Sequence, residues 1–169
     1  MKCKKIFIQH GIIGSFPFLI KCGRVDCGFF ISKNQTVICE KYLFKEIGEI
    51  RLQKSIKINN DKLLNNGKVN ILIVCHSKFM QQEIKYASLL AGGEYNIYLK
   101  YHPLESRVPY DILASKTNAI VLDKADFIEA DIVIGYQSTL MEEYANIGVP
   151  VYYYSDMDFD SVIDKLINI

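Results

Sequence analysis

All three histidines of the sequence follow short apolar runs, where a strand would end and a loop would begin. Of these, His102 is the most informative, because it precedes Pro103, and proline forces the residue before it into an extended conformation. The imidazole would then point out of the edge of a sheet, where it could donate a hydrogen bond to a phosphate; a surface histidine that only ends a strand gives the same pattern. His10 precedes Gly11, which would let another backbone approach beside the ring, an arrangement useful for phosphate contact or acid–base catalysis.

Hydroxyl and carboxylate side chains stand near the expected starts of helices. Ser138 and Thr139 directly precede one helix, where hydroxyls and free amide groups form a natural anion site, although helix capping alone explains the same residues. Glu143 lies in the first turns of that helix, where the helix dipole favours a carboxylate and where it could also accept hydrogen bonds from ribose hydroxyls. Ser77 follows another apolar run and can cap the next helix, so it is the second candidate for contact with a ribose or a base.

Several chemistries are excluded by missing motifs. The sequence contains neither G-x-G-x-x-G nor G-x-x-x-x-G-K-[ST], so we expect no dinucleotide cofactor and no ATP hydrolysis. A Cys75–His76 nucleophile pair is disfavoured, because neighbouring residues on a strand point to opposite faces. The acidic D-x-D spacings at 156–160 are explained by capping of a following helix, so we predict no metal site.

Composition limits the partners. The chain has 169 residues, 50% hydrophobic and 23% charged, and a net charge of +1, which favours neither nucleic-acid binding nor more than a peripheral association with a membrane. No apolar run approaches the roughly 20 residues of a membrane helix. Five cysteines without C-x-x-C spacing indicate neither a disulfide framework nor a zinc site, and they fit a reducing cytoplasm.

The second part of the chain alternates apolar runs with helical segments, which predicts an α/β fold: a Rossmann-like parallel sheet with helices on both faces, over 69–169. Expected strands are 69–75, 96–101, 119–122, 131–136 and 150–154, and expected helices begin at Ser77, span 140–147 and end the chain at 159–167. In an open parallel sheet, ligands bind beyond the carboxyl ends of the strands. That rule places His102, Ser77 and Ser138 at one edge.

Residues 1–58 are predicted to be a small lobe of their own. Its strands are expected at 5–9 and 28–32, with a helix over 36–47 that is capped by Asn34 and stopped by Gly48. The polar stretch 59–68 is the best candidate for a linker or a long connection.

With these residues in place, the chain resembles the nucleotide-binding half of GT-B glycosyltransferases that build bacterial surface polysaccharides from cytidine-activated donors. This group includes CDP-glycerol glycerophosphotransferases and the bacterial sialyl-, polysialyl- and Kdo-transferases. Four segments carry the resemblance, namely a His-Gly element, a His-Pro motif, a Ser-Ser/Thr stretch and an acidic residue followed by a Gly-x-Pro turn: 9–11, 100–103, 130–139 and 143–150.

The resemblance implies roles for particular residues. His102, Ser138 and Thr139 would contact the donor phosphates, Glu143 would approach the ribose, and His10 would act in catalysis or phosphate contact. The implied activity is transfer from a CMP- or CDP-linked donor to a sugar hydroxyl, with no cofactor and with a base supplied from elsewhere. Two alternatives stay open, a non-catalytic nucleotide-binding or regulatory subunit and a UDP-sugar epimerase-like enzyme.

The resemblance also implies a partner. In GT-B enzymes an acceptor-side domain precedes the His-Gly element, whereas only nine residues precede His10, so residues 1–58 could be a remnant of that domain. The apolar stretch 12–20 could form an interface, because large exposed apolar patches mark contact surfaces. We therefore expect a homodimer or a complex with an acceptor-domain chain; folding of this stretch into the local core is the alternative.

Overall fold

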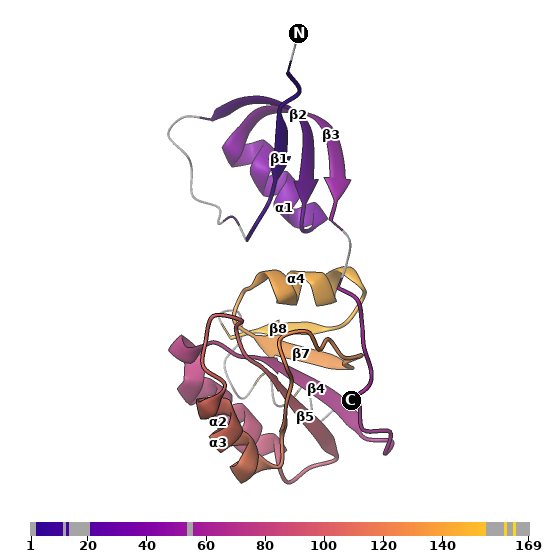
Figure 1. The fold of residues 1–169 in the computed structure, drawn as a ribbon, viewed down its shortest axis with the longest axis vertical. Helices are drawn as coiled ribbons and strands as arrows, with labels where there is room; N and C mark the ends of the chain where they lie inside the picture. The colour runs from indigo at the N-terminus through magenta and orange to yellow at the C-terminus, as the bar shows by residue number, and fades with distance from the viewer. Residues whose placement is uncertain are drawn as a thin grey trace. The chain divides into compact units, whose positions relative to one another are not determined.

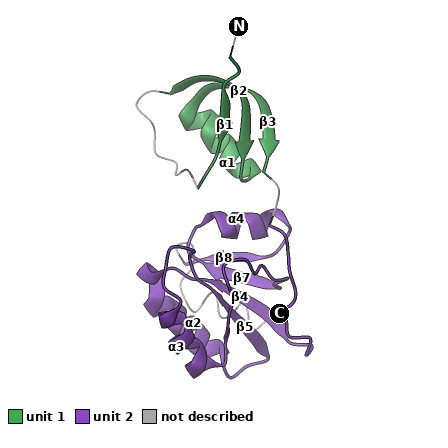
Figure 2. Ribbon diagram, in the orientation of Figure 1, with its two compact units in different colours: residues 1–55 green, residues 56–169 purple. Residues whose placement is uncertain are grey.

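The structure is a computed structural model that describes residues 3–11, 13, 21–53, 56–154, 161 and 164. The chain divides into two compact units, Met1–Ser55 and Ile56–Ile169 (Figures 1 and 2). Each unit contains one sheet, and every strand pairing in the described residues is parallel. The predicted α/β class with a Rossmann-like parallel sheet is confirmed.

Unit 1 is a three-stranded parallel sheet with a short helix packed on it. The strands lie in the order β1-β2-β3, and α1 (Lys33–Ile38) continues into one turn of π-helix, η1 (Cys39–Leu43). The strand bounds are Ile6–Ile8 for β1, Cys22–Phe30 for β2 and Phe44–Leu52 for β3. Buried side chains of β2, η1 and β3 form its core: Val25, Phe30, Cys39 and Phe44.

The predicted helix over 36–47 is wrong at both ends. It begins earlier, with Ser32 rather than Asn34 as its cap, since the Ser32 hydroxyl accepts a hydrogen bond from Gln35 N–H (3.2 Å). It ends before Phe44, where β3 starts, because the apolar residues of this segment fit a strand as well as a helix. Gly48 does not stop a helix; a Cβ there would lie 2.8 Å from the Asp26 carbonyl oxygen, so the glycine lets β3 approach β2 closely.

Unit 2 is built on a five-stranded parallel sheet with the order β6-β5-β4-β7-β8. The register pairs Val74 with Lys100 on one side and with Gly135 on the other. The strand bounds are Val69–Val74 for β4, Tyr95–Lys100 for β5, Ile120–Val121 for β6, Ile132–Gly135 for β7 and Val151–Tyr153 for β8. These strands agree with the five predicted runs to within one or two residues at each end.

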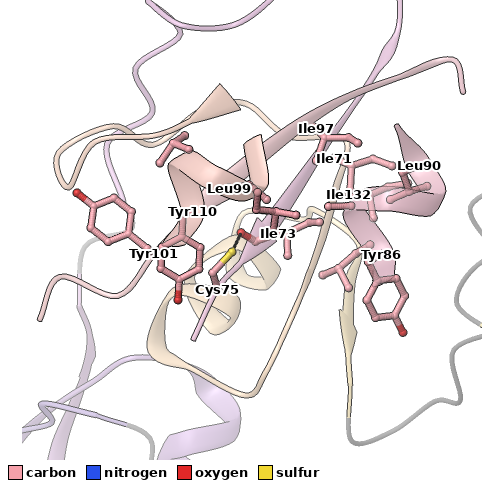
Figure 3. Packing of buried hydrophobic residues seen from close by; sticks show 14 residues of the cluster. Ile71, Ile73, Cys75, Tyr86, Leu90, Ile97, Leu99, Tyr101, Tyr110 and Ile132 are labelled. Carbon is pink, nitrogen blue, oxygen red and sulfur yellow. Dashed lines mark hydrogen bonds between the residues drawn. The ribbon is translucent and has the colours of Figure 1, made fainter. Parts of the chain in front are cut away.

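Helices cover both faces of this sheet. Side chains of α2 (Met80–Leu90) and α3 (Val108–Thr117) pack with β4, β5 and β7 in one core cluster, which includes the stacked rings of Tyr101 and Tyr110 (centroids 5.7 Å apart; Figure 3). Side chains of α4 (Thr139–Asn146) belong to a second cluster on the other face. The predicted arrangement of helices on both faces is therefore present.

Helix α3 was not among the predicted elements. Its first turn contains Pro109, which suits a helix start, and Asn118 ends it in the left-handed region at φ 54°. Both are ordinary helix signals. They were obscured because the polar residues around Pro109 are also typical of a loop.

The polar stretch 59–68, predicted to be a linker or a long connection, is a connection that belongs to unit 2. It has no helix or strand, but Leu63 packs against the core on the α4 face, and Leu64 N–H donates to the Tyr98 hydroxyl (2.8 Å). Asn66 and Asn96 exchange side-chain hydrogen bonds at 2.8 and 2.9 Å. The polar residues of this segment therefore fasten it to unit 2, which begins at Ile56.

Some predictions fall on residues that the structure does not describe. These are the apolar stretch 12–20 apart from Ile13, the acidic residues 156–160, and the last helix apart from Ser161 and Asp164. Ile13 packs against the core of unit 1. Among the described residues, none of the helices combines the length and the apolarity needed to cross a bilayer.

Candidate functional site

The strand order of unit 2 defines where a ligand would bind. The chain runs from β4 outward through β5 to β6, then returns to the other side of β4 for β7 and β8. The order therefore reverses between β4 and β7, and in open parallel sheets the crevice for a ligand lies beyond the carboxyl ends of the strands at such a point. The residues that follow β4, β5 and β7 form the candidate site.

His102 follows the end of β5 and is held in a defined orientation. The preceding Tyr101 is buried, whereas His102 is exposed. The N–H of Leu104 donates to Nδ1 of the ring (3.3 Å), and Glu105 N–H donates to the His102 carbonyl oxygen (2.9 Å). Because Nδ1 accepts a hydrogen bond, the neutral ring carries its proton on Nε2, which is then available as a donor.

His76 occupies the equivalent place at the end of β4. It is exposed, and its Nδ1 accepts a hydrogen bond from Lys78 N–H (3.2 Å), so its neutral ring also presents an Nε2 proton. The centroids of the His76 and His102 rings are 6.2 Å apart. Sequence reasoning located His76 beyond a strand end but gave it no role in binding.

Ser77, the predicted ribose or base contact, is bound to a carboxylate of the protein. Its N–H lies 2.9 and 3.1 Å from the two oxygens of Glu105, and its hydroxyl donates to Oε1 of Glu105 at 2.8 Å. Tyr110 donates a third hydrogen bond to the same carboxylate (2.6 Å). The first amide of the β4-to-helix turn, which binds phosphate in many nucleotide-binding folds, thus binds Glu105 here.

Glu105 is therefore the fixed negative charge of the site. Partial burial works against ionisation, but the hydrogen bonds from Tyr110 and Ser77 outweigh it and lower the pKa of Glu105. Its Oε1 is 3.7 Å from Nδ1 of His76, which is longer than a hydrogen bond. No sequence signal pointed to Glu105, because its partner Ser77 lies 28 residues earlier in the chain.

Ser138 and Thr139 stand where α4 begins, beside the end of β7. Ser138 caps the helix, since its hydroxyl oxygen accepts a hydrogen bond from Met141 N–H (3.4 Å), and this leaves its proton free to donate. Thr139 is the first residue of the helix and is partly exposed. A Cβ at Gly135 would lie 2.8 Å from the Val74 carbonyl oxygen, so the glycine allows the close approach of β7 to β4 at the point where the strand order reverses.

Two stacked aromatic rings connect the segments that follow β4 and β7. Phe79, in the 3-10 helix η2 (Ser77–Phe79), stacks on Tyr136, which follows β7; their centroids are 4.4 Å apart and their planes differ by 20°. Tyr136 is 39% exposed. A ring that is held on one side and partly open on the other offers a surface on which a base or a sugar can stack.

Glu143, the other predicted ribose contact, lies further along α4. It is half-buried, and burial raises its pKa. Within the described residues it makes no hydrogen bond or ion pair with another side chain. Its neighbour Glu142 is more deeply buried and accepts a hydrogen bond from the Tyr153 hydroxyl (3.5 Å).

A second glutamate lies beneath the site. Glu83, on α2, is fully buried, and its Oε1 accepts a hydrogen bond from His76 N–H (2.6 Å). Its Oε2 and the Tyr154 hydroxyl have no hydrogen-bond partner among the described residues. Burial, opposed by the His76 hydrogen bond and reinforced by the charge of Glu105, raises the pKa of Glu83 to about 7.

Two cations that follow or end β5 are already engaged in structural contacts. Lys100, at the end of β5, is buried, and its Nζ donates to the carbonyl oxygens of Asp123, Lys124 and Asp126 at 2.5, 3.0 and 2.7 Å. Burial lowers its pKa to about 8. Arg107 pairs with Asp111 (2.9 Å) and with Asp123. These two cations are therefore not available to a ligand, whereas Lys78, two residues after His76, is exposed.

His10 lies in unit 1, whereas the other predicted site residues lie in unit 2. It is exposed beyond the end of β1. The preceding Gln9 is buried; its amide nitrogen donates to Gln35 Oε1 (2.6 Å) and to the Gly11 carbonyl (2.7 Å), which fixes the backbone around His10. A Cβ at Gly11 would meet no atom within 4 Å, so local packing does not require this glycine.

Among the described residues no group of three or more His, Cys, Asp or Glu side chains could hold a metal ion. Comparison of the chain with protein-family models gives no match, and comparison with curated proteins gives no significant match.

Proposed function

We propose that unit 2 binds the nucleotide of an activated donor, and that the protein is the donor-binding part of a glycosyltransferase or glycerophosphotransferase. The donor would be cytidine-activated, CMP- or CDP-linked, and the product a bacterial surface polysaccharide. One observation carries this proposal: His102 and Ser138 lie just beyond the carboxyl ends of β5 and β7, on either side of β4, in a sheet with the strand order of nucleotide-binding folds.

Each residue then has a defined task. His102 would donate its Nε2 proton to a phosphate oxygen, and Ser138 and Thr139 would add hydroxyl donors where the α4 dipole favours an anion. Such donors, fixed in advance, would stabilise the charge that develops on the leaving nucleotide, as a metal does in other transferases. Glu143 would approach the ribose, and His10 would act in catalysis.

The remaining expectations follow from this proposal. Transfer requires an acceptor and a base from a second domain, so we expect a homodimer or a complex with an acceptor-domain chain. All five cysteines are free, which fits action in the reducing cytoplasm, where we place the protein.

Calorimetric titration tests the proposal directly. We expect CMP and CDP to bind weakly, and UDP and ATP to bind less well. His102→Asn should reduce the affinity by about 10- to 100-fold, because a hydrogen bond to a charged phosphate contributes roughly 1–3 kcal/mol. Asparagine can still accept the hydrogen bond from Leu104 N–H, so the turn, and with it the thermal stability, should be kept.

Two results would contradict the proposal. Equal binding of UDP or ATP would reject the cytidine preference, and no binding of any nucleotide at millimolar concentration would reject the site. Transfer assays with CMP- or CDP-linked donors then distinguish an enzyme from a binding subunit, and His10→Gln should lower transfer without weakening nucleotide binding.

A further inference from the structure

We propose that His76 and His102 together clamp one phosphate group, and that Glu105 limits this clamp to a phosphate with a single negative charge. The ligand class is then a nucleoside monophosphate joined to its cargo as a phosphodiester, rather than a nucleoside diphosphate. This inference rests on the proposed function and narrows it to one kind of donor.

The two histidines are level with each other at the edge of the sheet. Val74 of β4 pairs with Lys100 of β5. His76 lies two residues after Val74, and His102 lies two residues after Lys100. The ladder continues between them, because Cys75 N–H donates to the Lys100 carbonyl (2.8 Å). The register of the sheet, and not a flexible loop, therefore sets the 6.2 Å between the ring centroids.

Both rings present the same donor. A backbone N–H two residues further along occupies Nδ1 of each ring, from Lys78 for His76 and from Leu104 for His102. Each neutral imidazole therefore offers its Nε2 proton. At this ring separation, two N–H groups can reach different oxygens of one phosphate, each over a hydrogen bond of about 2.9 Å.

The charge that is held in a fixed place beside the clamp is negative. Glu105 is ionised and fixed by donors from Ser77 and Tyr110, with its Oε1 3.7 Å from Nδ1 of His76. Lys100 and Arg107 are committed to carbonyl oxygens and carboxylates, and the Lys78 ammonium lies 5.5 Å from the centre of the Phe79 ring. With both imidazoles in their neutral form, two donors beside a fixed carboxylate suit a phosphodiester, which carries one negative charge, better than a terminal phosphate or a pyrophosphate.

A series of cytidine nucleotides with increasing negative charge on the phosphate groups tests the clamp. Cytidine 5′-methyl phosphate, CMP and CDP are titrated at pH 8 into the full chain and into Glu105→Gln, His76→Asn and Lys116→Gln. The wild type should bind the methyl ester at least as tightly as CMP and CDP. Glu105→Gln keeps the shape of the side chain and an acceptor oxygen for Ser77. It should raise the affinity for CMP about tenfold more than the affinity for the methyl ester, and the affinity for CDP by a still larger factor.

The His76 variant tests the contribution of the second histidine of the clamp. Asparagine can still accept from Lys78 N–H, so His76→Asn should keep the fold, checked by circular dichroism, and lose about tenfold or more in affinity for the methyl ester. The exposed Lys116 lies in the last turn of α3, and its replacement should leave all three affinities unchanged.

Failure of the clamp and failure of the proposed function give different experimental results. Unchanged binding by His76→Asn, or an equal effect of Glu105→Gln on all three ligands, overturns the clamp while the proposed function stands. If no cytidine nucleotide binds but dimethyl phosphate, a phosphodiester with one negative charge, shifts the imidazole ¹⁵N signals of both His76 and His102, the clamp stands and the proposed function fails. If neither dimethyl phosphate nor nucleotide moves these signals, both are rejected.

Discussion

The buried Glu83 should make the stability of unit 2 depend on pH in an unusual direction. Its side chain is fully buried on α2, and its only hydrogen bond among the described residues comes from His76 N–H (2.6 Å). Burial raises the pKa of Glu83 from an ordinary 4.5 to about 7. The substitution Glu83→Gln removes this titration and keeps an oxygen that can accept from His76.

The sign and size follow from proton linkage. Between pH 4.5 and about 7 the folded protein keeps the Glu83 proton and the unfolded chain has lost it, so the free energy of unfolding falls as the pH rises through this range. The difference between the two pKa values corresponds to about 3 kcal/mol, at about 1.4 kcal/mol for each pKa unit. The wild type should therefore lose about 2 to 3 kcal/mol relative to Glu83→Gln between pH 5 and pH 8. At low pH both side chains are uncharged, and each buries a donor without a partner, the carboxyl proton of Glu83 or the amide nitrogen of the variant.

Urea unfolding at several pH values measures this difference. Tyrosine fluorescence reports mainly on unit 2, because ten of the eleven tyrosines follow residue 56 and the chain has no tryptophan. Replacing the exposed glutamate in Glu94→Gln gives the baseline for loss of a carboxylate. A stability difference between wild type and Glu83→Gln that stays constant from pH 5 to pH 8 would refute the reasoning.

Three further predictions concern packing and exposure. Gly135→Ala should destabilise unit 2 by about 1–3 kcal/mol, because the added Cβ would lie 2.8 Å from a backbone oxygen of β4. Gly92→Ala, whose added Cβ would meet no atom within 4 Å, should not destabilise it, and urea unfolding compares the two variants. Lys100→Met should cost about 3 kcal/mol in the same assay, because three carbonyl oxygens of 123–126 lose their donor; an unchanged midpoint would contradict this. A thiol reagent at neutral pH should label the exposed cysteines and spare the buried ones, whose thiol pKa is raised by burial: Cys3 and Cys22 against Cys39 and Cys75.

The parallel sheet of unit 2 was predictable because its strands are continuous apolar runs separated by helical segments. The failures in the fold have a common cause. The helix over 36–47 was extended too far because the apolar residues Phe44 and Ile47 fit the spacing of a helix as well as that of a strand. Only the pairing of Val25 with Ile47 across the sheet makes this segment a strand. Such pairing joins residues far apart in sequence, which a local pattern cannot show.

The candidate site was predictable for residues whose position is set by the strand directly before them in the sequence. His102 and Ser138 were located by the strands that precede them, and the structure places them at the same edge. The contacts of Ser77 with Glu105, and the 6.2 Å between His76 and His102, depend on how distant strands and turns meet. These contacts change Ser77 from a candidate ligand contact into a partner of a carboxylate.

The most direct test of the account is a map of backbone amide chemical shifts during titration with CMP. We predict that the largest changes in unit 2 fall on residues that follow β4, β5 and β7, including His76, His102 and Ser138. Saturable binding with its largest changes at the amino ends of these strands, near Val69, Tyr95 and Ile132, would contradict the account.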